Sequence, residues 1–325
     1  MSSTLEKIQS PINNELKKFR PYFSSIVKSK VSLLNIITKY ILKTKGKQMR
    51  PMMVFLVANL WGEVNESTYR GAALIELMHT ATLTHDDVVD DSNQRRGFFS
   101  INALWKNKIA VLLGDFLLSK GLLLAVDNKD YDLLQIVSKA VKDMSEGELL
   151  QIEKTRKLNI TEEVYYEIIR KKTAVLLAAC AAVGTKSVKK EDPIVEEMWQ
   201  MGEYIGMAFQ IKDDLFDLDV NNKTGKPAGN DLQEKKMTLP LIYALEQVDI
   251  AQKRKIKKIV GKNKKTKEDI KQLVDFIKNN GGVEYAEKQM HQFSKQALDI
   301  LQKLESSAYR ESLEALINYT TTRNK

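Results

Sequence analysis

Proline, glycine and cysteine are all scarce in this chain of 325 residues, which has 6 prolines, 15 glycines and 1 cysteine. Strand-rich folds need many turns, and turns are rich in proline and glycine, so this scarcity argues against a β fold. The single cysteine, Cys180, lies in an alanine-rich apolar segment. A thiol in such a segment is expected to pack inside the protein in a reducing compartment rather than to act as a nucleophile.

Signals for domain boundaries and for export are also missing. The chain contains no linker rich in proline, serine or glycine and no low-complexity block, which predicts a single domain over residues 1–325. Its N-terminus lacks the apolar core of a signal peptide. We expect no apolar run to be both long enough and free enough of charge to span a bilayer. These absences predict a soluble protein of the cytoplasm.

The formal net charge is +9, and much of the excess lies in residues 253–258 and 262–271. A solvated helix face explains these lysines most simply. Attraction to an anionic membrane surface is the main alternative and allows transient contact with a bilayer. Nucleic acid is disfavoured as a partner, because no aromatic residues alternate with the lysines.

Apolar residues recur with a helical period along almost the whole chain, which predicts an all-α protein built as a large helical bundle around a central cavity. Residues 68–91 are apolar around the whole helix surface, as expected for a central buried helix. The other predicted helices span residues 5–28, 32–43, 51–61, 103–126, 131–153, 161–183, 193–218 and 240–247, with two or three more between residues 250 and 319.

Two acidic clusters share the pattern D-D-x-x-D. The residues are Asp86, Asp87 and Asp90 in the first cluster and Asp213, Asp214 and Asp217 in the second. On a helix, the first and last aspartates of this pattern fall within about 40° of each other. Both clusters follow apolar segments, where unpaired carboxylates are rarely tolerated. Two facing sets of oxygen ligands suit Mg²⁺ bound together with substrate phosphates, so we predict a diphosphate substrate. The alternative is a pair of solvated acidic helix ends.

A diphosphate site also needs positive charge from the protein. Six basic residues stand before a predicted helix or follow one of the acidic clusters, and a seventh, Lys172, lies on an otherwise apolar, alanine-rich predicted helix; the six are Lys47, Arg50, Arg95, Arg96, Lys226 and Lys236. Lys47 and Arg50 immediately precede a predicted helix, whose backbone N–H groups also favour anions. Each residue alone fits an ordinary surface charge, but together they form a coherent set of ligands for anions.

These motifs resemble those of trans-isoprenyl diphosphate synthases. Residues 79–90, HTATLTHDDVVD, resemble the first aspartate-rich region, particularly that of medium- and long-chain members. Residues 209–214, FQIKDD, together with GKP at 225–227 and KMTLP at 236–240, resemble the second. The resemblance covers nearly the whole chain. Two positions depart from the family pattern: Gln48 stands where an arginine is usual, and Lys235 where a glycine is usual.

The resemblance implies a type I isoprenoid synthase fold, usually as a homodimer, and condensation of isopentenyl diphosphate with geranyl or farnesyl diphosphate. It implies that the six aspartates hold Mg²⁺, three ions in all once the allylic diphosphate is bound. The allylic diphosphate would be bound by Arg95, Lys172 and Lys226, and Lys236 would also bind substrate. Isopentenyl diphosphate would be bound by Lys47, Arg50, His79 and Arg96. Carbonyl groups near Lys172 and Thr173, and the side chain of Gln210, would stabilise the allylic cation.

Product length is predicted from the residues that precede the first acidic cluster on its helix. Ala81, Met78 and Leu74 follow one another back along the expected tunnel. Each helical turn adds about 5.4 Å of depth, close to one isoprene unit. Short-chain members of the family often carry an aromatic residue at the level of Ala81. The small residue here therefore predicts a product longer than twenty carbons, and the resemblance implies about thirty to fifty. The alternative is that Ala81 only permits close helix packing.

Other functions remain open at this stage. A class I terpene cyclase also ionises an allylic diphosphate, but its second motif normally mixes Asn, Ser or Thr with Glu. A non-catalytic subunit of a heteromeric prenyl synthase commonly lacks part of the acidic motifs, and this chain keeps both. A basic helical protein that binds nucleic acid is the most distant alternative.

Overall fold

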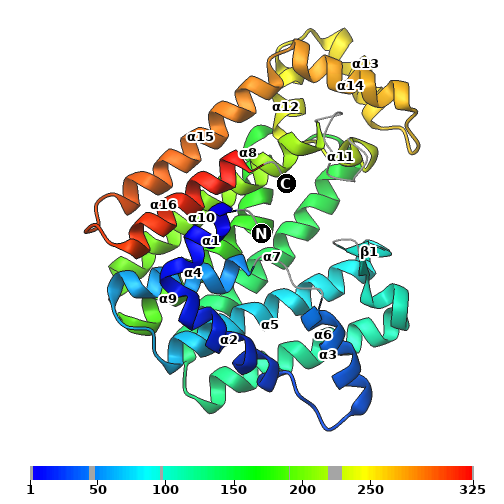
Figure 1. Cartoon of the computed structure of the whole chain (residues 1–325). Coiled ribbons are helices and arrows are strands. Elements are labelled where there is room, and N and C mark those ends of the chain that lie inside the picture. Colours follow the sequence, from blue (N-terminus) through cyan, green and yellow to red (C-terminus); the bar gives the residue numbers. More distant parts are fainter. Residues whose placement is uncertain (1–2, 44–47, 96–97, 190, 219–228, 324–325) are drawn as a thin grey trace. The chain divides into compact units, whose positions relative to one another are not determined.

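The computed structural model describes residues 3–43, 48–95, 98–189, 191–218 and 229–323. Nearly all regular structure in these residues is helical (Figure 1). A short antiparallel ribbon also occurs, in which β1 (Gln94–Arg95) pairs with β2 (Phe98–Phe99). The prediction of an all-α fold is confirmed.

Contacts divide the chain into two compact units. Unit 1 comprises Met1–Val141, Ala179–Trp199 and Glu305–Leu313, and unit 2 comprises Lys142–Ala178, Gln200–Leu304 and Glu314–Lys325. Four helices contribute residues to both units: α7 (Tyr131–Lys157), α9 (Val175–Val188), α10 (Asp192–Asp217) and α16 (Ala308–Thr322). A single domain over residues 1–325 stays a prediction.

Unit 1 contains the N-terminal helices. They are α1 (Ser3–Gln9), η1 (Ser10–Ile12), α2 (Asn13–Ile26), α3 (Ser32–Lys43), α4 (Met49–Trp61), α5 (Glu66–Val89) and α6 (Ile101–Asp127). The single helix predicted over residues 5–28 is wrong, because the short 3₁₀ turn η1 separates α1 from α2. Pro11 lies in this turn. A proline has no backbone N–H to continue the hydrogen bonds of a helix, which accounts for the break.

Helix α5 is the buried helix that the sequence predicts. It begins at a capping box, in which the Asn65 side chain accepts a hydrogen bond from the Thr68 backbone N–H and the Thr68 hydroxyl accepts one from the Asn65 N–H. Ala72, Ala73, Leu74, Ile75 and Leu77 are all almost inaccessible to solvent. The helix therefore carries the first acidic cluster on a backbone fixed by packing on all sides.

Helix α6 packs along α5 (Figure 1). Two glycines permit the close approach. A Cβ atom on Gly121 would lie 2.4 Å from Met78 Cε, and one on Gly114 would lie 2.1 Å from His85 Nε2. Side chains near the acidic cluster of α5 therefore rest on the backbone of α6.

The expectation that no apolar segment reaches the length of a membrane span is wrong for α6. Over an 18-residue window this helix has a mean hydropathy of 2.0, and 33% of the window is buried. By length and composition it could cross a bilayer. The core helix of a soluble protein passes the same test, so the result does not by itself place α6 in a membrane.

Unit 2 contains most of the C-terminal helices. They are α8 (Glu162–Ile169), η2 (Arg170–Ala174), α11 (Asn230–Gln233), α12 (Leu239–Glu246), α13 (Ile250–Val260), α14 (Lys267–Asn279) and α15 (Gly282–Leu301). The side chains of Thr161, Asp249 and Thr266 cap α8, α13 and α14. In the described chain after residue 250 there are four helices, α13 to α16, and not the predicted two or three.

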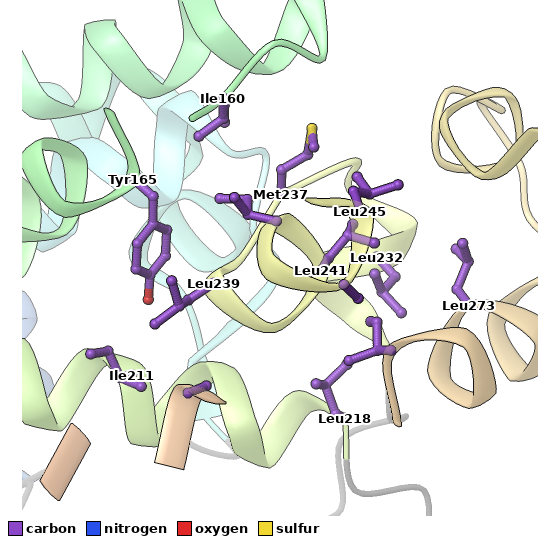
Figure 2. Packing of buried hydrophobic residues seen from close by; sticks show 14 of the residues in the cluster. Ile160, Tyr165, Ile211, Leu218, Leu232, Met237, Leu239, Leu241, Leu245 and Leu273 are labelled. Atoms are coloured by element: carbon purple, nitrogen blue, oxygen red, sulfur yellow. The ribbon is translucent and has the colours of Figure 1, made fainter. Parts of the chain in front are cut away.

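The core of unit 2 lies where α10 ends and α12 begins. Ile211 of α10 and Leu218, the residue after this helix, belong to the same buried cluster as Leu239 and Leu241 of α12 (Figure 2). Leu273 of α14 completes this part of the cluster. Burial of such side chains contributes about 25 cal/mol for each Å² of apolar surface removed from water. This packing fixes the last turn of α10, which carries the second acidic cluster.

Candidate active site

The first acidic cluster forms the last turn of α5. The Asp90 backbone N–H donates to the Asp86 carbonyl at 2.8 Å, so the helical path continues across the cluster. Asp86 is half-buried and Asp90 is exposed, whereas Asp87 is only 4% exposed. The Asp87 carbonyl accepts hydrogen bonds from Asn102 Nδ2 and from the Ser92 N–H, each at 3.0 Å. The first and last aspartates of the motif are therefore accessible, and the middle one is buried.

The second acidic cluster forms the last turn of α10 and repeats this arrangement in part. Asp214 is 4% exposed, whereas the side chain of Asp213 is 42% exposed. The Asp217 carboxylate accepts hydrogen bonds from the backbone N–H groups of Asn230 and Asp231, each at 3.0 Å. Asp217 therefore fixes the start of α11 as well as the end of α10.

A chain of hydrogen bonds surrounds Asp214. The Tyr165 hydroxyl donates to Asp214 Oδ2 at 2.6 Å, and Gln210 Nε2 donates to Asp214 Oδ1 at 2.9 Å. The Thr173 hydroxyl donates to Gln210 Oε1 at 2.7 Å. Burial raises the pKa of Asp214 to about 7, and the nearby Asp231 charge adds to the increase, while the bonds from Tyr165 and Gln210 oppose it.

The accessible Asp213 has a cationic partner from the far end of the chain. Arg323 Nη2 contacts Asp213 Oδ1, and its guanidinium lies 3.9 Å from the centre of the Phe209 ring. The Arg323 side chain is 10% exposed. An arginine stacked on an aromatic ring and paired with a carboxylate is held by both interactions.

A cavity of about 130 Å³ lies in unit 2 beside these groups. Five of the residues predicted from the sequence line it: Lys172, Thr173, Gln210, Asp214 and Lys236. Tyr165 and the apolar side chains of Ile168 and Ile169 form other parts of the wall. The structure thus brings together residues from α8, η2, α10 and the segment before α12.

Both lysines of this cavity have acidic partners. Lys172 Nζ lies 2.5 Å from Glu148 Oε2 and donates to Gln151 Oε1 at 3.4 Å. Lys236 Nζ lies 2.6 Å from Glu234 Oε2 and 3.3 Å from Asp231 Oδ1. Burial alone would lower the pKa of Lys236, but these two carboxylates raise it above the usual lysine value. Lys236 therefore remains cationic and able to attract an anion.

The segment that carries Lys172 and Thr173 is a π-helical turn and not the continuous α-helix predicted over residues 161–183. In η2 the Val175 N–H donates to the carbonyl of Arg170, five residues earlier. Such π turns inside helices occur frequently at functional sites. Gly147 of α7 allows the turn to pack closely, because a Cβ there would lie 2.9 Å from the Lys172 backbone nitrogen.

In unit 1, two of the residues predicted to bind isopentenyl diphosphate are described. Arg50 Nε lies 2.6 Å from Glu76 Oε1, and both side chains are largely buried. His79 is half-buried and lies one turn after Glu76 on α5. Gln48, which stands where the family usually has arginine, accepts a hydrogen bond from Arg20 Nε at 3.1 Å.

The three residues predicted to set product length are all buried in unit 1. Leu74 is 1% exposed, Met78 5% and Ala81 0%. Ala81 belongs to a core cluster that also contains Leu113 and Leu117 of α6. Both the expected tunnel and the alternative of simple helix packing are compatible with these positions, so the tunnel stays a prediction.

Several predicted residues cannot be placed. Lys47, Arg96 and Lys226 lie outside the described residues, as does the side chain of Arg95. The predicted approach of the first acidic cluster to the second also stays a prediction. Tyr165, Glu76, Asp231 and Arg323 were missed from the sequence. A tyrosine or glutamate in a helix gives no signal of its partner, and Arg323 lies far along the chain from Asp213.

The simplest interpretation of the lysines in residues 253–271 is a solvated helix face, but some of these lysines are buried or half-buried. Lys265 is only 7% exposed and donates to the carbonyls of Lys262 and Gln233. Lys257 Nζ donates to the Leu158 carbonyl at 2.9 Å. Part of this positive charge therefore stabilises the C-terminal helices, while contact with a membrane surface stays a prediction.

The donor groups fit a divalent cation by their chemistry. Burial and the Asp231 charge raise the pKa of Asp217 to about 6, as burial raises that of Asp214 to about 7. Carboxylates that repel one another in a partly desolvated place are stabilised by a cation, and Mg²⁺ prefers such oxygen ligands. Among residues 3–43, 48–95, 98–189, 191–218 and 229–323, no three acidic, histidine or cysteine side chains already converge on one metal position.

Comparisons with known proteins identify the family of this chain. A family model described as polyprenyl synthetase matches residues 31–277. The all-trans-nonaprenyl-diphosphate synthase (geranyl-diphosphate specific) of Rhodobacter capsulatus is 35% identical over 317 residues, which cover 97% of this chain and 96% of that protein.

Two solved structures have the same fold over nearly their whole length. The polyprenyl synthase of Caulobacter crescentus CB15, crystallised with calcium and isoprenyl diphosphate, has a TM-score of 0.90 and 30% identity, covering 100% of this chain and 99% of that one. The geranylgeranyl pyrophosphate synthase of Bacteroides thetaiotaomicron has a TM-score of 0.84 and 38% identity, covering 98% and 99%.

The all-α fold and the cavity lined by acidic and basic side chains are those expected of a prenyltransferase, and the family model and the relatives show that the chain belongs to the polyprenyl synthetase family. It is accordingly a polyprenyl diphosphate synthase, and the family uses divalent metal ions.

Proposed function

We propose that this enzyme condenses isopentenyl diphosphate with geranyl or farnesyl diphosphate to make an all-trans polyprenyl diphosphate. The observation that carries the proposal is the cavity of unit 2, where Lys172, Thr173, Gln210, Asp214 and Lys236 share one wall. Cationic side chains and a hydrogen-bonded amide at a carboxylate-bearing cavity suit an allylic diphosphate. A geranyl starter is supported by the relative from Rhodobacter capsulatus, which is described as specific for geranyl diphosphate.

The accessible aspartates are the first choice as metal ligands. Asp86, Asp90 and Asp213 would hold Mg²⁺, with the remaining aspartates of both motifs completing the acidic surroundings. When bound, Mg²⁺ supplies Lewis-acid stabilisation of negative charge on the departing diphosphate. We propose three ions in the complex with the allylic diphosphate, as the resemblance to the family implies.

The chain's own residues act on both substrates. Lys172, Lys236, Arg95 and Lys226 would bind the allylic diphosphate and hold it while its C–O bond breaks. The Gln210 amide and the carbonyls near Lys172 and Thr173 face the resulting allylic cation. Isopentenyl diphosphate, held by Lys47, Arg50, His79 and Arg96, attacks with its double bond and forms the new C–C bond. The proton then lost from the product is taken up by the released diphosphate.

The proposed product length rests on the size of the side chain at position 81 and on the names of relatives. Ala81 is small, and nonaprenyl diphosphate is the product that one relative's name states. Both support a product of about thirty to fifty carbons, since each turn of α5 past Ala81 adds about 5.4 Å. The similarity to the geranylgeranyl pyrophosphate synthase of Bacteroides thetaiotaomicron is the argument for a twenty-carbon product.

We further propose that the enzyme is a homodimer formed through α6. Large apolar side chains on one face of this helix, after the kink at Lys106, are exposed: Val111, Leu112, Leu122, Leu123 and Val126. Contiguous exposed apolar surface of this kind marks an interaction site. Asp115 lies on the same face, with its side chain 60% exposed. A carboxylate in the middle of a bilayer is costly, so a second copy of this chain is a better partner than lipid.

Two alternatives remain within the same chemistry. A class I terpene cyclase would need no isopentenyl diphosphate, and the second basic group around Arg50 and His79 argues against it. A subunit of a heteromeric synthase would have no activity alone. The predicted cytoplasmic location is retained as part of the proposal.

Elongation by the purified protein tests the proposal. The enzyme is incubated with Mg²⁺, labelled isopentenyl diphosphate and either geranyl or farnesyl diphosphate, and the dephosphorylated products are separated by chain length. We expect label in alcohols longer than twenty carbons. Cyclised hydrocarbon formed without isopentenyl diphosphate would identify a cyclase, and activity only after addition of a second protein would identify a heteromeric subunit.

A further inference from the structure

Tyr165 lines the unit 2 cavity but has no role in the proposed reaction. Tyr165, on α8, is 4% exposed, and its ring belongs to the apolar core of unit 2 (Figure 2). Its hydroxyl points toward the helix that carries Ile211 (Figure 2). There it donates to Asp214 Oδ2 at 2.6 Å. A hydroxyl placed this deeply in an apolar core is costly unless it is hydrogen-bonded, so the partner decides what the tyrosine does.

The bond from Tyr165 is the first of three consecutive hydrogen bonds. Asp214 accepts at its other oxygen from Gln210 Nε2 at 2.9 Å, and Gln210 Oε1 accepts from the Thr173 hydroxyl at 2.7 Å. All four side chains line the same cavity. The order of donors and acceptors is fixed by chemistry, because the amide nitrogen of Gln210 can only donate and its amide oxygen can only accept.

This order sets the orientation of Gln210. An amide side chain can rotate by half a turn at little cost, which exchanges its oxygen and nitrogen. Here the Asp214 carboxylate accepts a hydrogen bond from the amide nitrogen of Gln210, and the Thr173 hydroxyl donates one to its amide oxygen. Asp214 can do this only while its own carboxylate is kept from rotating. The Tyr165 hydroxyl is the group that holds the opposite oxygen of Asp214.

We propose that Tyr165 is a positioning residue for the reaction, which holds Asp214 so that Asp214 in turn orients the Gln210 amide at the cavity wall. This rests on the proposed function, in which Gln210 faces the allylic cation. Tyr165 touches neither substrate in this account. Its removal therefore lowers the rate of the chemical step and leaves substrate binding unchanged.

The adjacent tyrosine provides a matched control. Tyr166 has the same side chain on the same helix, but its ring packs against Phe293 at 5.7 Å. Within the described residues it is not part of the cavity wall. Replacement of either tyrosine by phenylalanine removes one hydroxyl and leaves the ring, but only Tyr165→Phe removes the hydrogen bond to Asp214.

The test compares kcat and KM of the full-length wild-type enzyme with those of Tyr165→Phe and Tyr166→Phe. We expect Tyr165→Phe to lower kcat by about tenfold, the effect of one hydrogen bond lost at the transition state, with both KM values within twofold of wild type. Tyr166→Phe should keep the wild-type kcat. In a Gln210→Leu background, Tyr165→Phe should cause no further loss, because the group it positions is gone.

Equal kcat values for the two tyrosine variants would overturn the role of Tyr165, as would a full additional tenfold loss in the Gln210→Leu background. If Tyr165→Phe does not fold, Thr173→Val decides the question, because it removes the other end of the same chain of bonds and is expected to give the same kcat loss at unchanged KM. If the wild-type enzyme forms no elongated product, the proposed function is wrong. Product analysis of the wild-type enzyme detects this outcome separately from the kinetic effects of the tyrosine variants.

Discussion

Arg323, which follows the last residue of the C-terminal helix, contacts Asp213 of the second acidic cluster. The guanidinium also lies 3.9 Å from the centre of the Phe209 ring and 5.5 Å from that of Phe216. One residue near the C-terminus thus packs against two rings and a carboxylate of α10. The pairing joins α16 to the helix that carries the site.

We predict that Arg323→Gln lowers the free energy of unfolding by about 1 to 3 kcal/mol, because a charge-assisted hydrogen bond and two cation–π contacts are lost. Arg323→Lys should recover little of it, since an ammonium cannot stack as a planar guanidinium does. Urea unfolding followed by circular dichroism measures the effect. Arg254→Gln, at an exposed position of α13, is the control. Equal midpoints for the variants at 323 and 254 would contradict the prediction.

The ion pair between Arg50 and Glu76 leads to a second prediction. Arg50 is fixed by Glu76 Oε1 at 2.6 Å, so its charge is already oriented before substrate binds. We expect Arg50→Ala to raise the KM for isopentenyl diphosphate by about tenfold or more, with a smaller effect on the KM for the allylic substrate. Steady-state kinetics with one substrate varied at a time measures both constants. Equal changes in the two KM values would argue against separate binding sites.

The burial of Ala81 beside Leu113 and Leu117 gives a third prediction. A phenylalanine at 81 overfills this space and should block any chain that grows past it. Ala81→Phe is expected to shorten the product to about fifteen or twenty carbons while the first condensation continues, because each lost turn removes about 5.4 Å of depth. Overpacking should also destabilise the fold by about 1 to 3 kcal/mol. Chromatography of the products checks the length, and a full-length product from this variant would show that the tunnel does not pass Ala81.

The buried thiol of Cys180 gives a fourth prediction. Burial raises the pKa of this thiol well above its usual range, and its relative exposure is 0%. Only the thiolate reacts, so native protein should not react with a disulfide reagent over minutes, whereas protein in urea should react fully. Rapid labelling of the native enzyme with loss of activity would mean that Cys180 is accessible and near the site.

The sequence predicted the acidic clusters well because their geometry is local. The D-D-x-x-D spacing places Asp86 and Asp90 on successive turns, and the hydrogen bond from the Asp90 N–H to the Asp86 carbonyl confirms that turn. The burial of α5 could likewise be predicted, because apolar residues surround it. The spacing does not indicate which aspartate of a cluster faces inward. In the second cluster Asp214 is buried, where it accepts hydrogen bonds from Tyr165 and Gln210.

Long-range pairing and small backbone changes were beyond the sequence argument. The contact of Arg323 with Asp213 joins residues 110 positions apart, and no periodicity links them. The backbone hydrogen bond of the π turn in η2 joins residues five apart, whereas those of an α-helix join residues four apart. This difference leaves the apolar pattern of the sequence almost unchanged. The break at η1 could have been found from Pro11, whose missing N–H interrupts the helix.

The central claim is that the two acidic clusters act together with divalent metal to ionise an allylic diphosphate. Asp91 provides a control for the general loss of a carboxylate near the first cluster. It is exposed, lies outside the D-D-x-x-D pattern and has a φ of 46°, a conformation that asparagine adopts readily. Asp91→Asn should therefore keep the wild-type fold and turnover.

Turnover of Asp86→Ala and Asp213→Ala, measured with saturating substrates and Mg²⁺, tests this claim most directly. We predict that each variant loses several orders of magnitude in kcat while its circular dichroism spectrum remains that of the wild type, because metal stabilisation contributes several kcal/mol at the transition state. Near-normal turnover in both folded variants would contradict the account.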